Sequence, residues 1–556
     1  MKYNFNKYHV ILATTLASMG CTKLNETLPM QFPYSSTSGG ASAGGILVQA
    51  YNDMSSTNIM FGQDQLFSLE ENVTDESLVP TRAGDWDDNG VWRTLHTHAW
   101  DATHGQSSTV FNNLGTIESD ATTVLALNPT AEQAAEATFL RSLAQFYFLD
   151  LYGQVPYRPV SAYNGVAAAP VMKPAEAIDT LVNNLTGIIG VLSSSNKNFQ
   201  ATPNAARFLL MKVLLNKQAF LNRQTPAAQN AADMNQVRSL GQAIMSSGQL
   251  VNGSHPLALN ANYFDNFGPN NGSYGGSGTG GISTEGIFVY PNNGTATNEN
   301  GTGNGGIDAR WMMALHYNSW DATGVYGGAG WNGFSTIADV YNAFDPTDTR
   351  RGNVPYPAPN AAGVSPISGL NVGLDEGQQY NEAGAKIQDR KGNNLVFSPT
   401  VTNVETNVAT LEGDGIRGIK YYPDYAHYTS TSSNQLMMFR LGDVYLMVAE
   451  ADLSGASGGA AEALTLVNTL HSVRGAAPLA TLTLVNKSNL YDGTTLLEER
   501  QKELWWESWR RQDLIRMGVF LVPWALKPTD DPKFLLFPIP ATQLVANPNL
   551  KQNPGY

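Results

Sequence analysis

Apolar residues recur at three- and four-residue spacing in several separate blocks of the chain, which is the period of an amphipathic helix. The clearest block is 132–152, which ends at Gly153 with Pro156 beyond it, a typical helix stop. Its apolar face is formed by Ala137, Leu140, Leu143, Ala144, Tyr147, Phe148 and Leu151. Two further blocks, 174–191 and 203–221, each begin with a proline, which is favoured in the first turn of a helix.

The predicted helices fall into two groups. A weaker block at 229–246 completes the first group, and 435–453, 458–473 and 495–517 form the second. Helices of about 15–20 residues joined by short loops predict stacked helical hairpins in the manner of tetratricopeptide repeats, although no repeat of about 34 residues is visible. We therefore place the helical scaffold mainly in residues 130–250 and 435–520.

Between the two groups lies a loop-rich lobe, which we place mainly in residues 252–430 together with 60–120. The segments 270–281 and 292–306 consist almost entirely of Gly, Asn, Ser and Thr. Trp and Tyr are interleaved with this sequence, which favours ordered surface loops over a linker. The predicted fold class is mainly α: helix pairs that carry an irregular lobe.

The composition of the chain excludes some classes of binding partner. The 556 residues include 33 Lys and Arg and 47 Asp and Glu, for a formal charge of −14, which argues against nucleic acid as a partner. Charged residues make up 14% of the chain, below the usual quarter or so, so the polar surface must come from Asn, Ser, Thr, Gln and Gly.

The N-terminus has the features of a bacterial lipoprotein signal. Residues 1–20 hold Lys2 and Lys7, then an apolar stretch too short to span a bilayer, then a glycine directly before Cys21. Cys21 is the only cysteine, so an intramolecular disulfide and a Cys-based metal site are excluded. We expect cleavage before Cys21 and lipidation of its thiol. A free cysteine after an ordinary signal peptide remains the alternative, because Ser18 stands where leucine is usual.

Motifs for catalysis and metal binding are weak. Gly301–Gly306 matches G-x-G-x-x-G, but a loop rather than a strand precedes it. Asp85–Gly90 matches the first half of a calcium loop, yet His96 stands where a bidentate Glu is required; a hydrogen-bonded turn is favoured, and another kind of calcium loop stays open. No carboxylate stands at a ligand spacing from His96, His98 and His104. We expect no enzyme, no metal and no cofactor.

The ten tryptophans gather in groups. They are Trp86, Trp92 and Trp100; Trp311, Trp320 and Trp331; Trp505, Trp506 and Trp509; and Trp524. Trp505 and Trp509 lie one turn apart on a predicted helix, so the third group is expected in the core. The first two groups lie in Gly- and Asn-rich sequence, where flat rings suit stacking on sugars while nearby amides and charges bond hydroxyls. Anchoring of the loops by the same rings is the alternative.

The order and spacing of the motifs resemble the SusD/RagB family of nutrient-binding outer-membrane lipoproteins of Bacteroidetes, from Cys21 to Tyr556. The matching motifs are Thr74-Asp75-Glu76 with Val79 to Arg82, Trp86 to Trp100, Ala137 to Leu143 with Tyr152 to Pro156, Tyr263 to Phe267, Trp331 to Thr336, Phe344-Asp345 before Arg350, Arg440 to Glu450, Glu498 to Leu504, Arg511 to Gly518, Phe537 to Pro540 and Asn553 to Tyr556.

The resemblance implies a right-handed stack of tetratricopeptide-like helix pairs that carries the loop-rich lobe as one unit over residues 21–556. It also implies a non-catalytic protein on the outer face of the outer membrane, which binds oligosaccharide and acts as a lid on a SusC-like TonB-dependent barrel. Polar helix residues are then inter-helix ion pairs; these are Arg440, Asp443, Glu450, Glu503, Arg511 and Asp513.

The aromatic arc of glycan-binding members maps by motif position onto this chain. The candidate ligand-binding residues are Trp100, Tyr317, Trp331 and Trp320, with Asp75 and Arg82 as hydrogen-bonding partners. Two other functions remain open: a helical scaffold that binds only protein, and a surface glycoside hydrolase, which needs two carboxylates facing across a cleft.

Overall fold

The computed structural model describes residues 42–556 except 57–61, 83–84, 252, 254, 273–281, 293–306, 308, 320–329, 356–370, 381–384, 405–411, 422 and 425–431. The predicted signal peptide and Cys21 lie outside the described residues. Within them, no helix is both long and apolar enough to cross a bilayer.

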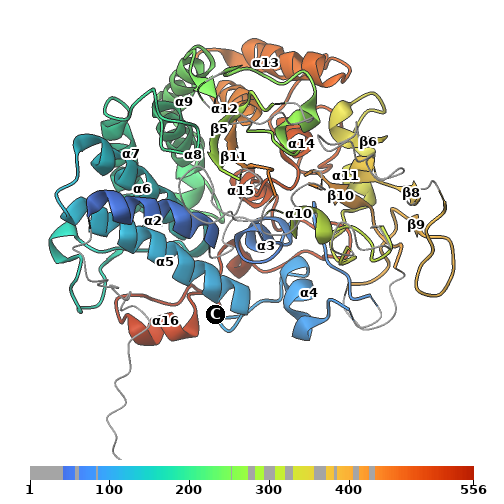
Figure 1. Cartoon of the computed structure of the whole chain (residues 1–556), viewed down its shortest axis with the longest axis horizontal. Coiled ribbons are helices and arrows are strands. Elements are labelled where there is room, and N and C mark those ends of the chain that lie inside the picture. The colour runs from blue at the N-terminus through green and yellow to red at the C-terminus, as the bar shows by residue number, and fades with distance from the viewer. Residues whose placement is uncertain are drawn as a thin grey trace, which may run out of the picture.

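Eight helices stack in chain order along one curved row (Figure 1). They are α2 (Ala43–Ser56), α5 (Gly105–Ala126), α6 (Ala131–Tyr152), α7 (Pro174–Ile188), α8 (Pro203–Leu221), α9 (Ala231–Met245), α12 (Leu441–Leu453) and α13 (Gly459–Arg474). Each of them packs against the next, from α2 on α5 to α12 on α13. The mainly-α fold of stacked helix pairs is thus confirmed.

Helix α6 shows how the sequence sets the ends of these helices. Thr130 accepts a hydrogen bond from the backbone of Gln133, whose side chain bonds back to Thr130, so the first turn is capped on both sides. Gly153 ends the helix at φ 68°, a conformation in which glycine has no steric cost. Buried residues lie on all sides of α6 because it packs against α2, α5, α7 and α8.

The row of helices extends further toward the N-terminus than the sequence indicated. We expected residues 60–120 in the loop-rich lobe, but α5 covers 105–126 and packs along α6, with α2 on its other flank. The helical periodicity of α5 is hard to detect in the sequence because Ser, Thr, Asn and Gly interrupt its apolar positions.

Two helices differ from the sequence-based prediction: one begins later, and the other is broken into two. Residues 436–440 form strand β11 (Leu436–Arg440), which pairs with β5 (Gly286–Tyr290) in a fully buried two-stranded sheet, and the helix starts only at 441. The block 495–517 is broken into α14 (Leu496–Leu504) and α15 (Arg510–Arg516). Trp505, Trp506 and Trp509 are buried as predicted, but they lie at the break and not on one helix.

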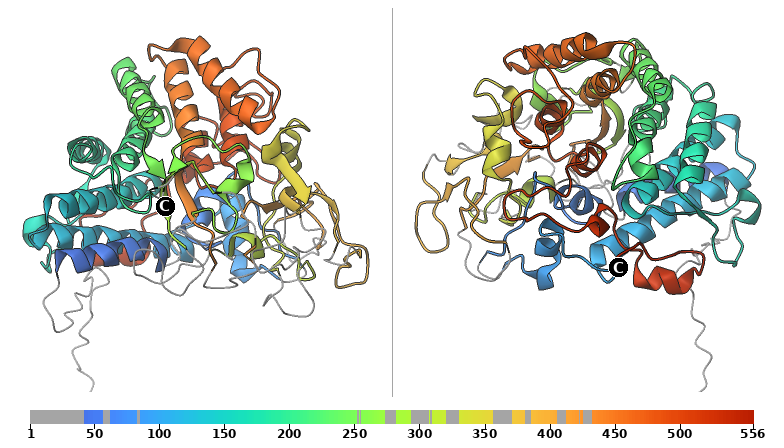
Figure 2. Two further views of the ribbon diagram at one scale, coloured as in Figure 1. Left: turned by 45° about the horizontal axis from the view of Figure 1, so that its top comes forward. Right: turned by 180° about the vertical axis from the view of Figure 1, so that it is seen from behind.

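The loop-rich lobe is built from short elements. Its helices are α3 (Leu66–Glu71), α4 (Val91–His96), α10 (Ala309–Met312) and α11 (Ala338–Asn342), and its strands are β6 (Gly352–Pro355), β7 (Asn371–Asp375), β8 (Gly377–Gln378), β9 (Val396–Phe397) and β10 (Arg417–Ile419). Strand β7 pairs antiparallel with both β6 and β10, and β8 pairs with β9. Elsewhere lie β1 (Val155–Pro156), β2 (Val171–Met172), β3 (Leu250–Val251), β4 (His255–Pro256) and α16 (Ala541–Ala546). Figures 1 and 2 show helix α2 and helices α5 to α9 on one side, this lobe on the other, and α12 to α15 between them.

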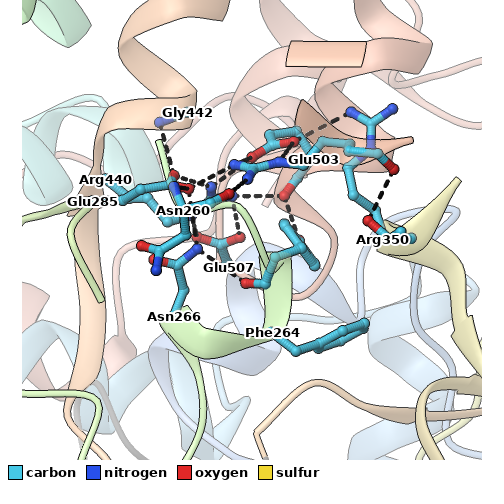
Figure 3. A network of polar contacts seen from close by, with 12 residues as sticks. Asn260, Phe264, Asn266, Glu285, Arg350, Arg440, Gly442, Glu503 and Glu507 are labelled. Atoms are coloured by element: carbon cyan, nitrogen blue, oxygen red, sulfur yellow. Dashed lines mark hydrogen bonds and ion pairs between the residues drawn. The ribbon is translucent and has the colours of Figure 1, made fainter. Parts of the chain in front are cut away.

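A buried network of charges joins the later helices to the lobe (Figure 3). The guanidinium of Arg440 contacts Glu285 at 2.9 Å and Glu503 at 2.6 Å, and Arg474 contacts the same two carboxylates. Burial alone would raise the pKa of Glu503, but the guanidinium groups of Arg474, Arg440 and Arg350 lower it well below its usual value. Glu503 is therefore held ionised inside the protein.

The other predicted ion pairs also form. They are Asp443 with Arg500 and Lys212, Glu450 with Arg516, Asp513 with Arg500 and Arg516, and Arg511 with Asp150. The prediction that these polar residues join elements of the fold is confirmed.

Candidate functional site

Trp100, the first candidate for ligand binding, lies in the core. Its side chain is 2% exposed, and its indole N–H donates to the hydroxyl of Tyr556 at 2.8 Å. Phe537 stacks on the ring with centroids 4.7 Å apart, and Phe534 meets it edge-on at 4.9 Å. The prediction that Trp100 stacks on a ligand is therefore corrected, since the C-terminal segment covers its ring.

Asp75 is buried as well. Its carboxylate accepts from Arg510 at 2.8 and 2.6 Å and from the hydroxyl of Tyr491 at 2.6 Å. Burial alone would raise the pKa of Asp75, but the Arg510 guanidinium lowers it. The carboxylate is committed to an internal ion pair, so its predicted role in ligand binding is corrected.

Arg82 also points inward. It is fully buried, and its guanidinium donates to the hydroxyl of Ser335 at 2.7 Å, which ties the strand-like segment before Asp85 to the segment after Trp331. Its predicted contact with ligand is corrected, because its position is that of a brace beneath the surface. Trp320 lies outside the described residues, as does the Gly301–Gly306 motif.

Tyr317 and Trp331 are both partly exposed on the lobe, and the neighbouring residues Asp85 and Trp86 connect them. The hydroxyl of Tyr317 donates to Asp85 at 2.7 Å, and the indole N–H of Trp86 donates to the backbone oxygen of Trp331 at 2.7 Å. The Asp85-Trp86 dipeptide therefore links the hydroxyl of Tyr317 to the backbone of Trp331, and Arg390 lies over the face of Tyr317 at 4.6 Å. We call Asp85, Trp86, Tyr317, Trp331 and Arg390 the Tyr317 cluster.

Close backbone approach holds the segment around Trp331 in place. The backbone N–H of Trp331 donates to Met312, and the next three N–H groups donate to Leu315 and Met313. A Cβ on Gly330 would lie 2.1 Å from the oxygen of Leu315, and one on Gly333 would lie 2.4 Å from the ring of Trp86. Only glycine fits these two positions, which explains the sequence Gly-Trp-Asn-Gly.

Two carboxylates neutralise the charge of Arg390. Its guanidinium pairs with Asp85 at 2.8 Å and with Glu412, while the side chains of Arg390 and Asp85 are 44% and 42% exposed. Burial alone would raise the pKa of Glu412, but hydrogen bonds from Arg390 and His316 lower it. The cluster therefore presents polar groups to solvent without an unbalanced cation that would select an anionic ligand.

His316 supports the cluster from behind as a neutral ring. Burial lowers the pKa of His316, and its Nδ1 accepts from the backbone N–H of Asn318 at 3.1 Å. The proton therefore sits on Nε2, which donates to Glu412 at 2.9 Å. This hydrogen bond orients the carboxylate that holds Arg390.

The histidines and aspartates that could have bound a metal make contacts within the protein instead. His96 lies between the backbone oxygens of Ser77 and Ala525, and burial lowers its pKa to about 4. His98 bonds Asp530 and a backbone oxygen. Asp87 pairs with Arg93, and Asp88 accepts from Trp92 at 2.6 Å, as expected for the hydrogen-bonded turn. In the part of the chain that the structure describes, no three metal-ligating side chains converge.

Sequence reasoning found part of the cluster. Tyr317 and Trp331 were expected at the site, and Trp86 belonged to a tryptophan group noted for sugar stacking. Arg390 was missed because it comes from a separate polar loop, 73 positions beyond the tyrosine that it covers. The signal for Asp85 pointed to a turn, since its neighbours Asp87 and Asp88 form one.

Comparisons with known proteins agree on one family. The model of the SusD family matches residues 259–524, which include three members of the Tyr317 cluster. No curated protein matches the chain. A SusD superfamily protein from Parabacteroides distasonis ATCC 8503 superposes with a TM-score of 0.65 at 17% identity, covering 93% of this chain and 100% of its own.

Two further solved structures are similar. One is described as a laminarin-binding SusD-like protein, with a TM-score of 0.61, 17% identity, and coverage of 92% of this chain and 99% of its own. The other is surface glycan-binding protein A from Bacteroides thetaiotaomicron in complex with laminarihexaose, with a TM-score of 0.61, 16% identity, and coverage of 92% and 98%.

Proposed function

Since the chain belongs to the SusD family, we propose that it binds a neutral oligosaccharide at the Tyr317 cluster and does not cleave it. The observation that carries this proposal is the partial exposure of two aromatic residues, Tyr317 and Trp331, in one hydrogen-bonded cluster with the exposed side chains of Asp85 and Arg390. Trp331 and Tyr317 supply apolar ring faces, while the carboxylate and guanidinium supply acceptors and donors for sugar hydroxyls.

The geometry suits recognition without catalysis. Asp85 and Glu412 are both tied to the same guanidinium, so neither faces the other across an open cleft as the two carboxylates of a glycosidase do. Their role is to hold Arg390 over Tyr317 and thereby to fix the shape of the binding surface.

The similar structures suggest a first ligand to test. Because one of them is described as laminarin-binding and another holds laminarihexaose, laminarin leads the panel of glycans for this chain. Because the two structures are only 16–17% identical to this chain, other neutral glycans belong in the same panel.

We place the protein at the outer face of the outer membrane, anchored by lipid on Cys21, where it acts as a lid that passes glycan to a SusC-like TonB-dependent barrel. The lipoprotein signal before Cys21 and the family support this placement. Co-purification of the barrel with the tagged protein from outer membranes tests the partnership; recovery of the protein alone, under conditions that keep both in one membrane, would contradict it.

Affinity gel electrophoresis tests the proposed binding. We expect laminarin or another neutral polysaccharide in the gel to retard the protein, and Trp331→Ala to restore most of its mobility. The chain length of the polysaccharide, followed over time, is expected to stay constant. Shortening of the polymer would show an enzyme, and equal retardation of wild type and Trp331→Ala would place binding elsewhere.

A further inference from the structure

A second polar groove lies on the helical side of the molecule, away from the Tyr317 cluster. It has a volume of about 640 Å³ and lies between the α7–α8 loop, the start of α8, the end of α9 and the turn of β3 and β4. Figure 1 shows α7 to α9 on the opposite side from β8 and β9, near which Arg390 lies. The groove shares no residue with the Tyr317 cluster, and its volume is within the usual range for ligand sites.

The lining of the groove is cationic and rich in hydrogen-bonding groups. Its described residues include Lys197, Arg207, Asn196 and Gln249, together with several serines, but no acidic and no aromatic side chain. Glu132 lies nearby, where it accepts from the backbone of Ser193 and the amide of Asn196, but it does not line the groove. In a chain with a formal charge of −14, a groove with two cations and no acid stands out.

The guanidinium of Arg207 is oriented by a hydrogen bond but has no carboxylate partner among the described residues. Its guanidinium donates to Asn204 at 2.8 Å, and Asn204, which is 1% exposed, donates in turn to Ser247 at 2.8 Å. One of the five N–H groups of Arg207 is thus used to orient the guanidinium, and no carboxylate among the described residues pairs with it. Burial lowers the pKa of Arg207, and in the described part of the chain no carboxylate, Glu132 included, lies close enough to its guanidinium to offset this cost.

We infer that this groove binds an anionic oxo group, a carboxylate or sulfate, borne by a saccharide. A guanidinium binds a carboxylate or sulfate through two parallel hydrogen bonds, and an anion there would offset the cost of burying Arg207. The amides and serine hydroxyls suit sugar hydroxyls, whereas the lack of an aromatic ring in the described lining excludes stacking. This site does not depend on the proposed function of the Tyr317 cluster.

Calorimetric titration of the purified protein tests the groove, with trigalacturonate as the acidic probe and its methyl ester as the neutral one. We expect trigalacturonate to bind more tightly than the ester, and its affinity to fall as ionic strength rises. Arg207→Gln is expected to weaken binding about tenfold or more, because a hydrogen bond to a charged group is lost. Arg207→Lys retains the charge and part of the affinity.

Two control variants locate the effect. Lys217→Gln removes a cation from the same helix outside the groove and is expected to leave binding unchanged. Trp331→Ala is also expected to leave trigalacturonate binding unchanged. Loss of binding in this variant would show that the acidic ligand binds at the Tyr317 cluster, and would contradict the proposed site in the groove.

Three other results would also contradict the inference. Equal affinity for acid and ester, or an unchanged affinity in Arg207→Gln, would overturn the anion site. Sodium sulfate binding as tightly as trigalacturonate would show that the anion alone is recognised, and would overturn the saccharide part.

Discussion

At the scale of single residues, Trp100 and Trp331 carry the same side chain into different environments. Both stand in loop sequence, yet Trp100 is enclosed by Phe534, Phe537 and Tyr556, whereas Trp331 is partly exposed in the Tyr317 cluster. The first ring therefore contributes to stability and the second to the proposed binding surface.

Trp100→Ala is expected to lower the free energy of unfolding by about 3–5 kcal/mol, because it leaves a cavity and removes a buried hydrogen bond. Denaturant unfolding measures the loss. The affinity of the folded variant for glycan is expected to match the wild type, so a selective loss of affinity without a change in stability would contradict the buried role.

Asp75→Asn is expected to destabilise the protein by about 3–5 kcal/mol, because it leaves the guanidinium of Arg510 buried without its carboxylate. Asp85→Asn is the matched control: its side chain is 42% exposed, and we expect a loss of at most about 1 kcal/mol. Thermal unfolding of the two variants distinguishes them, and equal stabilities would contradict the assignment of Asp75 to the core.

The limits of the sequence at this scale have a physical cause. Exposure of Trp100 depends on Phe537 and Tyr556, more than 400 positions away, and burial of Asp75 depends on Arg510. Spacing along the chain cannot reveal such partners. Tyr317 and Trp331 were predicted from their positions in the family motifs, as was Trp100, and the motifs alone do not tell which of these rings is covered.

At the scale of elements, a pair of carboxyl groups holds α2 on α5. Asp53 of α2 and Asp120 of α5 share a hydrogen bond, so one of them must keep a proton. Burial, followed by the neighbouring Asp53, raises the pKa of Asp120 to about 8. Where α2 meets α6, Tyr51 donates to Glu136 at 2.6 Å, and burial raises the pKa of Glu136 to about 7.

The stability of this helix contact should depend on pH. An aspartate in the unfolded chain titrates near pH 4, so the contribution of the pair is full below about pH 4 and is lost as the pH rises through about 8. Asp120→Asn supplies a donor at every pH, and we expect it to reduce the decline of the melting temperature between these values.

Asp339→Asn changes an exposed aspartate and serves as the control for this measurement. It is expected to leave the pH profile of the wild type intact. A profile for Asp120→Asn that parallels the wild type would contradict the shared proton.

Helices were predicted well where at least one end carries a clear signal. Helix α6 has a capping box and a terminal glycine, and α7 and α8 start at prolines. The break between α14 and α15 was not predictable, because distant carboxylates satisfy the backbone there: Glu76 accepts from Trp506, and Glu71 accepts from Ser508. Propensity alone favours a continuous helix across those residues.

At the scale of the whole molecule, the row of helices supports the loop-rich lobe, and the lobe carries the proposed binding surface. Buried ion pairs around Glu503 fix the later helices against the lobe, and the lobe presents the Tyr317 cluster to solvent. The long, rigid row gives the short loops a fixed base, so the cluster can be formed in advance of ligand binding.

A crystal structure of the protein soaked with the polysaccharide fragment that retards it most tests this account most directly. We predict a sugar ring against the exposed side of Trp331 or Tyr317, with hydroxyls in hydrogen-bonding distance of Asp85 or Arg390. A neutral glycan bound elsewhere on the protein, with the Tyr317 cluster empty, would contradict the account.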